Sequence, residues 1–118
     1  MELTRKKVLL IDLSSLLSED NGLTDFHIRQ DILDRIATLN IQYVIIITGE
    51  KSVKTKAIEF FIFSYCKVAV RVLTEEESSF EALSPVMPHN MRKRDVFLSV
   101  GRKMDNIDNI TIEDFICR

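Results

Sequence analysis

The chain has 118 residues, of which 46% are hydrophobic and 29% charged, the composition of one ordinary globular domain. Its formal net charge of -2 excludes the strongly basic footprint of a nucleic-acid-binding domain, so we expect no nucleic-acid partner. Two cysteines, Cys66 and Cys117, are too few for a disulfide framework and fit a reducing compartment. No apolar run is long enough to span a membrane, and no signal peptide is evident. The sequence therefore predicts a cytoplasmic protein that does not partner with a membrane.

Four short apolar runs predict the strands of a sheet. They cover residues 8–11, 43–47, 68–73 and 110–112. The first two runs are apolar at nearly every position rather than at alternate ones. Such strands are buried on both faces, which is typical of a parallel sheet covered by helices.

Three segments between these runs predict helices, at about residues 24–40, 52–65 and 91–104. Thr24 or Asp25 would cap the first of them. In the second helix the lysines are expected to be solvated, and the phenylalanines are expected in the core. The residues predicted to face inward there are Val53, Ala57, Phe60, Phe61 and Ser64. The third would carry Lys93 near its start and Val96, Phe97 and Val100 along it.

The alternation of strands and helices predicts an α/β fold. Right-handed crossovers make it a three-layer, Rossmann-like domain with a four-stranded, mostly parallel sheet and helices on both faces. Neither an internal repeat nor a composition shift divides the chain, so residues 1–118 are expected to form a single domain.

Polar residues follow three of the four predicted strands. Asp12 ends the first, Thr48 ends the second, and Glu113 and Asp114 follow the fourth. Ligands of open α/β sheets bind outside the carboxyl ends of the strands, so we expect these residues to converge. The three carboxylates could hold a hard divalent cation, and Thr48 with the amides after it could hold a phosphate. Lys93 would balance the phosphate charge.

Each of these residues also has a purely local interpretation. Asp12 could cap a helix or turn, Thr48 and Gly49 could form a turn, and the acidic pair near the C-terminus could be solvated. The prediction of a site therefore depends on all of them following strands in one order.

This order resembles the haloacid dehalogenase superfamily, whose members are mostly magnesium-dependent phosphohydrolases. The family's four motifs are an apolar strand followed by Asp-x-Asp, a strand ending in Thr or Ser, a lysine opening a helix, and a strand ending in an acidic pair. The matching segments here are Val8 to Asp12, Val44 to Gly49, Lys93 to Phe97 and Ile110 to Asp114. The stretch from Ile47 to Ser52 is similar to capless phosphatases of the sugar-acid and polynucleotide-end types.

The resemblance implies a catalytic role for two residues. Asp12 would be the nucleophile that attacks phosphorus, and Lys93 would neutralise the charge of the transferred phosphoryl group. Thr48, Gly49 and Lys93 would bind the phosphoryl oxygens. The partner implied is a phosphorylated substrate.

The resemblance also implies a Mg²⁺ site. Asp12 and the backbone carbonyl of Ser14 would be ligands, and Glu113 or Asp114 would complete the site. Ser14, however, stands where the family has its second Asp, the general acid/base. A hydroxyl cannot replace a carboxyl group there, and loss of general acid–base catalysis typically costs about 10²–10⁴-fold.

Two functions are therefore predicted. The first is a degenerate phosphohydrolase with weak or lost activity that acts as a binding or assembly component, with a partner protein. The alternative is an active, small, capless phosphatase with Asp12 as its nucleophile. A receiver-like phosphoacceptor domain is a third and weaker reading, because a single acidic residue follows the first strand. We also expect a sheet edge left short near the C-terminus to invite a homo-oligomer or a larger assembly.

Overall fold

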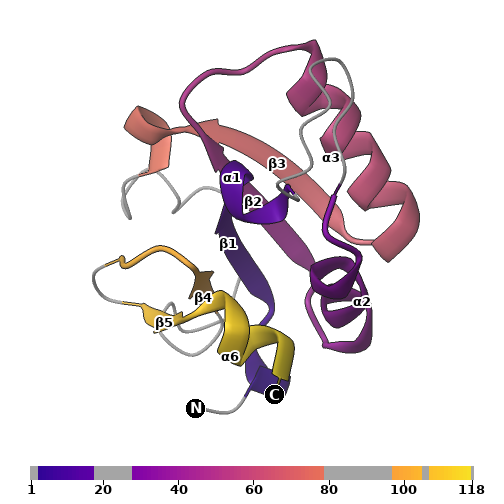
Figure 1. The fold of residues 1–118 in the computed structure, drawn as a ribbon, viewed down its shortest axis with the longest axis vertical. Helices are drawn as coiled ribbons and strands as arrows, with labels where there is room; N and C mark the ends of the chain where they lie inside the picture. The colour runs from indigo at the N-terminus through magenta and orange to yellow at the C-terminus, as the bar shows by residue number, and fades with distance from the viewer. Residues whose placement is uncertain (1–2, 18–27, 79–96, 105–106, 118) are drawn as a thin grey trace.

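The computed structural model describes residues 3–17, 28–78, 97–104 and 107–117. Its strands form one parallel sheet of five strands, in the order β3-β2-β1-β4-β5 (Figure 1). The strands are β1 (Val8–Asp12), β2 (Tyr43–Thr48), β3 (Ala69–Thr74), β4 (Phe97–Val100) and β5 (Asp108–Ile110). The order 3-2-1-4-5 is that of a doubly wound, Rossmann-like sheet. The predicted α/β class is confirmed, whereas the predicted number of four strands is wrong.

The described helices lie between and after these strands. They are α1 (Leu13–Leu16), α2 (Gln30–Thr38), α3 (Val53–Cys66) and α6 (Ile112–Cys117), with two short 3-10 helices, η1 (Leu3–Arg5) and η2 (Glu75–Ser78). Helix α3 begins at a reciprocal capping box, in which Ser52 and Thr55 each bond the backbone amide of the other. It ends at Cys66, and the capping residue Lys67 adopts the left-handed conformation with φ 58°. No helix in these described ranges is both long and apolar enough to cross a membrane.

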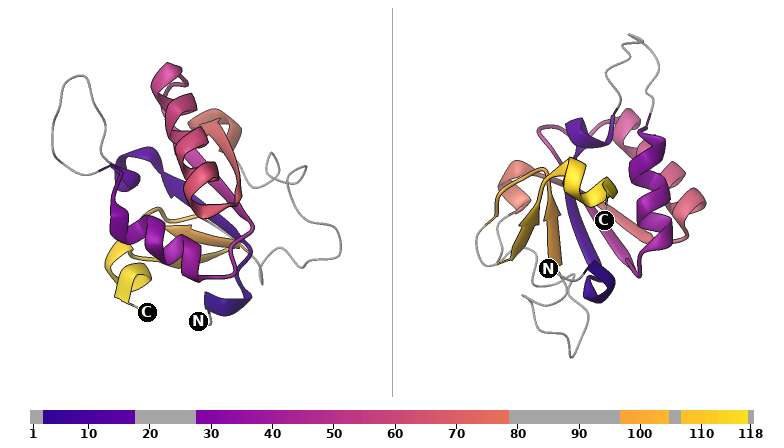
Figure 2. Two further views of the ribbon diagram at one scale, coloured as in Figure 1. Left: turned by 90° about the vertical axis from the view of Figure 1, so that its right-hand side faces the viewer. Right: turned by 60° about the horizontal axis from the view of Figure 1, so that its bottom comes forward.

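Both faces of the three central strands, β1, β2 and β4, are buried at nearly every position. Alternate strand residues, among them Leu9, Ile11 and Val44, pack against the buried side chains of α1, α2, α3 and α6. The residues between them, among them Leu10 and Ile45, form a second cluster on the other face. The four described helices thus lie on one side of the sheet (Figure 2). The predicted helices are confirmed on this face of the sheet. Helices on the opposite face stay a prediction.

Two predicted boundaries near the C-terminus are wrong. Residues 97–100, expected in a helix over 91–104, form β4, which pairs in parallel with β1 and is fully buried. The strand expected at 110–112 ends at Ile110, and helix α6 begins at Ile112. Residues 91–96, like the predicted caps Thr24 and Asp25, lie outside the described residues.

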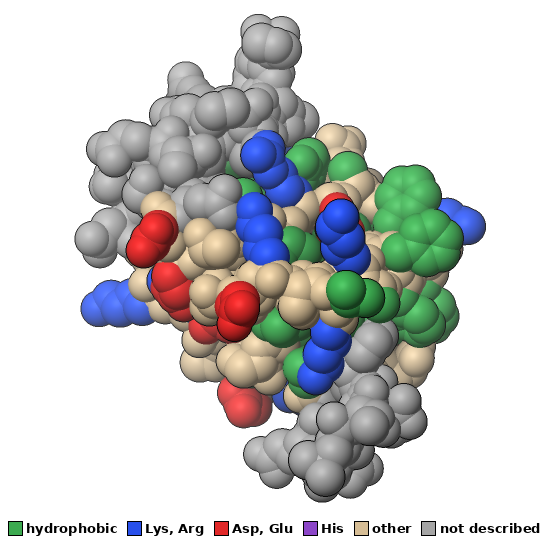
Figure 3. Space-filling model, turned by 90° about the horizontal axis from the view of Figure 1, so that it is seen from above, with side chains coloured by type: hydrophobic (Ala, Val, Ile, Leu, Met, Phe, Trp, Pro, Cys, Tyr) green, Lys and Arg blue, Asp and Glu red, His purple; other side chains and the backbone are tan. Residues whose placement is uncertain are grey.

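The predicted inward face of α3 is also wrong. Val53 is 86% exposed and Phe60 is 72% exposed, and the other residues predicted to face inward are exposed too. The buried side chains are instead Thr55, Ile58, Ile62 and Cys66. Helix α3 carries apolar residues on both faces, so its sequence alone does not select the buried one. Hydrophobic side chains therefore gather on the α3 side of the molecule (Figure 3). The nearby lysines at 51, 54 and 56 are exposed, as predicted.

Candidate functional site

The candidate site lies where the strand order reverses. From β1 the chain builds the sheet toward β2 and β3 on one side, and it later adds β4 and β5 on the other. The crevice outside the carboxyl ends of β1 and β4 is therefore the expected ligand site of a doubly wound sheet. Asp12 is the last residue of β1, and Gly101 and Arg102 directly follow β4.

An ion-pair network spans this point. The Arg102 guanidinium donates from Nη1 to Asp12 Oδ1 at 3.1 Å and to Glu75 Oε1 at 2.9 Å. Its Nη2 donates to Glu75 Oε2 at 2.5 Å. The hydrogen bonds from Arg102 lower the pKa of the Glu75 carboxyl. The bonds to Glu75 and then Asp12 raise the pKa of the Arg102 guanidinium, which therefore stays charged. We call these three residues the switch-point triad.

A sharp turn after β4 positions Arg102. Gly101 has a φ of 74°, in the left-handed region, and its amide donates to the Ile110 carbonyl at 2.9 Å. The buried Ser99 hydroxyl donates to the Arg102 carbonyl at 2.5 Å, and this hydrogen bond holds the turn against β4. A Cβ at position 101 would lie 3.1 Å from both Ile112 Cγ1 and Ser15 Oγ. Glycine is thus required here by conformation and by space.

A pocket of about 320 Å³ opens beside the triad. Among its lining residues are four of the predicted site residues, Asp12, Ser14, Thr48 and Gly49, together with Glu75. The structure thus brings together the predicted residues that follow the first two strands. Asp12 occupies the N-cap position of α1 but makes no capping hydrogen bond, so its carboxylate is directed to Arg102.

Thr48 has a local role in the turn after β2. Its side chain is nearly buried, and its hydroxyl donates to the Glu50 carbonyl at 3.2 Å. The same oxygen accepts from the Glu50 amide at 3.4 Å. These bonds satisfy a polar group at a buried position. Binding of a phosphate by Thr48 and Gly49 stays a prediction.

The acidic pair sits in the first turn of α6 rather than at the end of a strand. Thr111 precedes this helix, and its hydroxyl accepts from the Asp114 amide at 3.1 Å. Carboxylates in a first helical turn interact favourably with the helix dipole. This interaction is a local structural reason for acidic residues at positions 113 and 114. The spacing Thr-x-x-Asp is a helix-start signal that could have placed them there from sequence.

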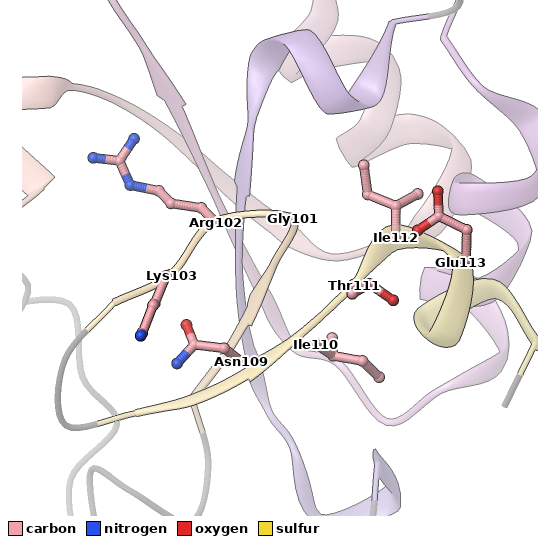
Figure 4. A pocket seen from close by; sticks show the side chains of 8 residues that line it. All are labelled: Gly101, Arg102, Lys103, Asn109, Ile110, Thr111, Ile112 and Glu113. Carbon is pink, nitrogen blue, oxygen red and sulfur yellow. The ribbon is translucent and has the colours of Figure 1, made fainter.

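Glu113 lines a different pocket from Asp12. This second pocket, of about 480 Å³, lies between the turn after β4 and the start of α6 (Figure 4). The Arg102 side chain points away from Glu113, on the other side of Gly101. Asp114 is not among the lining residues of either pocket.

The predicted Mg²⁺ ligands do not line one common pocket in the part of the chain that the structure describes. There, no three His, Cys, Asp or Glu side chains form a group able to hold a metal ion. Asp12 and Ser14 share a pocket, but Asp12 Oδ1 accepts a hydrogen bond from Arg102. Lys93 lies outside the described residues. The Mg²⁺ ligands, and the role of Lys93, therefore stay predictions.

Arg102 and Glu75 are the site residues that the sequence analysis missed. Arg102 follows the apolar run from Phe97 to Val100 and a glycine, a pattern typical of a strand and its turn. Once that run is assigned as a strand, Arg102 falls at the carboxyl edge of the sheet beside Asp12.

In comparisons with family models, with curated proteins and with solved structures, no match to this chain is found.

Proposed function

We propose that this chain is a phosphohydrolase-like domain that has lost turnover and serves as a binding or assembly component. The observation that carries the proposal is the hydrogen bond from Arg102 to Asp12. A carboxylate nucleophile works beside a bound cation that also coordinates a phosphoryl oxygen. The Arg102 guanidinium supplies the positive charge at Asp12 but has no coordination site to offer, and it is already shared with Glu75.

Position 14 supports the same proposal. Ser14 lines the pocket together with Asp12, and its hydroxyl does not exchange protons near neutral pH as a carboxyl group does. Loss of a general acid/base typically costs about 10²–10⁴-fold in rate. This loss of rate would add to the loss expected because the Asp12 carboxylate is bound to Arg102.

The switch-point triad could bind a phosphate-bearing ligand if the phosphate replaced one of the carboxylates that contact Arg102. Two carboxylates and one guanidinium carry a formal charge of -1, so an anion cannot simply add to them. Arg102 forms a planar fork that fits phosphate as well as carboxylate. Glu75 is 55% exposed, so it is the carboxylate that an incoming phosphate would displace. The ligand would be a phosphorylated small molecule or a phosphorylated partner protein.

The alternative is an active capless phosphatase. The gathering of Asp12, Ser14, Thr48 and Gly49 around one pocket favours it. On that alternative Asp12 attacks phosphorus, and the Arg102 bond must open before Mg²⁺ and substrate bind.

Release of phosphate from a generic aryl phosphate in the presence of Mg²⁺ separates the two functions. We expect the wild-type protein to release no more phosphate than the Asp12→Asn variant. Release that Asp12→Asn abolishes, and that Ser14→Asp increases, would overturn the proposal in favour of the enzyme. Folding of each variant is checked by circular dichroism.

Titration with inorganic phosphate tests the binding step. We expect phosphate to shift the backbone NMR signals of Gly101 and Arg102 in the wild-type protein. Glu75→Gln should bind phosphate more tightly, because the competing charge is gone, and Arg102→Met should not bind it. Equal binding by all three proteins would show that the switch-point triad is not the phosphate site.

A further inference from the structure

Helix α3 carries a stripe of residues that faces away from the sheet. The stripe consists of Val53, Ala57, Phe60 and Ser64, all exposed, which we call the outer stripe. An exposed apolar stripe on a packed helix is typical of an interaction surface. Figure 3 shows hydrophobic side chains gathered on the side of the molecule where α3 lies.

The other sides of α3 are already in contact with this chain. Ile58 and Ile62 face the sheet and are fully buried. On one flank, the Tyr65 hydroxyl donates to Asp34 Oδ1 of α2 at 2.9 Å. The opposite flank lies over the edge strand β3, where Val70 lines a groove with α3. The outer stripe is therefore the side of the helix that a partner would cover.

We propose that the outer stripe packs antiparallel against the outer stripe of a second copy of this chain. The steps along the stripe are four, three and four residues, so the pattern is the same in both directions. A two-fold axis through its centre places Ala57 opposite Phe60 of the second copy, and Val53 opposite Ser64. Each large side chain then meets a smaller one, as two-fold interfaces require.

The flanks of the stripe are also self-complementary. Lys56 shares one flank with Phe63, which is 55% exposed, and Lys54 shares the other with Phe61. The lysines lie in the N-terminal half of α3 and the phenylalanines in the C-terminal half. Antiparallel packing therefore brings each lysine to an aromatic ring of the second copy, where cation–π attraction is favourable. Parallel packing would set lysine against lysine, which favours the antiparallel arrangement.

The first experiment is sedimentation equilibrium of the full chain over micromolar to high micromolar concentrations. We expect a monomer–dimer equilibrium whose dissociation constant rises at least about 30-fold in Ala57→Glu, the loss expected from one central interface residue. The matched control is Ala37→Glu, which changes an exposed alanine of α2 and should leave the equilibrium unchanged. A strictly monomeric wild-type protein, or equal effects of both variants, would overturn the proposal.

Cysteine cross-linking tests the register. Val53→Cys and Ser64→Cys are made separately in a Cys117→Ser background and mixed before mild oxidation. We expect cross-links between the two variants, since antiparallel packing sets these positions opposite each other. Neither variant should cross-link to itself, because positions 53 and 64 are about 16 Å apart along the helix. Self-cross-links without mixed ones would overturn the antiparallel arrangement.

Discussion

The Arg102 guanidinium lies 3.1 Å from the Asp12 carboxylate although 90 positions separate the two residues in the chain. Their contact joins the carboxyl ends of β1 and β4, and the bonds to Glu75 add η2, which follows the edge strand β3. One cation thus connects both halves of the sheet at the place where such sheets bind ligands.

Replacing Arg102 by methionine should lower the free energy of unfolding by about 1 kcal/mol near neutral pH. The variant keeps much of the apolar stem but leaves the Asp12 and Glu75 carboxylates to repel each other. Arg102 lowers the pKa of Glu75 in the folded state, so its contribution is present above the carboxyl's unfolded-state pKa. It is lost as the pH falls through the lowered folded-state pKa.

Urea unfolding at neutral pH and at about pH 3 checks the origin of this loss. The difference between wild type and Arg102→Met should shrink at the lower pH. Lys103→Met, which removes an exposed neighbouring charge, is the control. A deficit of the same size at both values would indicate lost packing of the arginine stem rather than lost charge pairing.

Alanine at position 101 should destabilise the fold by about 2 kcal/mol, because an L-residue resists the left-handed region. The added Cβ would also press on Ile112 and Ser15, each 3.1 Å away. Gly49 provides the matched control, since nothing lies within 4 Å of a Cβ built there. Thermal unfolding should show a lowered Tm for Gly101→Ala and a nearly unchanged Tm for Gly49→Ala. Equal shifts would argue against a special role for the turn after β4.

Three of the predicted apolar runs mark strands of the structure. The predicted runs at 8–11, 43–47 and 68–73 lie within one residue of β1, β2 and β3. Strand β4 was missed because it has only four residues, and because apolar positions at 96, 97 and 100 also fit a helix. Its pairing with β1 is a long-range contact, which local spacing does not reveal.

A site residue could be predicted from the sequence only where the strand before it was predicted. Asp12 and Thr48 end strands that were recognised, and the structure places both at one pocket. Arg102 follows the strand that was missed, so its contact with Asp12 could not be foreseen. Glu113 and Asp114 follow an apolar run that predicts a strand, but the spacing of Thr111 and Asp114 also fits a helix start, which is what the structure shows.

The two apolar faces of α3 differ in what they contribute to stability. Ile62→Ala should cost about 2–4 kcal/mol, because the side chain is fully buried and a cavity would remain. Phe60→Ala removes a larger side chain but should change the free energy of unfolding little, since it is 72% exposed. Both are measured by urea unfolding at low protein concentration, where a dimer would dissociate. A larger loss for Phe60→Ala would place the phenylalanine in the core, as the sequence had predicted.

The two cysteines should react very differently with iodoacetamide. Burial, helped by the charge of Asp34, raises the pKa of the Cys66 thiol to about 11, and its sulfur lies 3.6 Å from the Leu33 carbonyl oxygen. The thiolate is the reactive form, so at pH 8 only about one Cys66 in a thousand is reactive, and it is also shielded. Cys117 is exposed. Peptide mass spectrometry of the native protein should therefore find the label on Cys117 alone, and Cys66 should react once urea unfolds the chain. The Cys117→Ser variant should lose native labelling, whereas rapid native labelling of Cys66 would contradict the packing of α3 against α2.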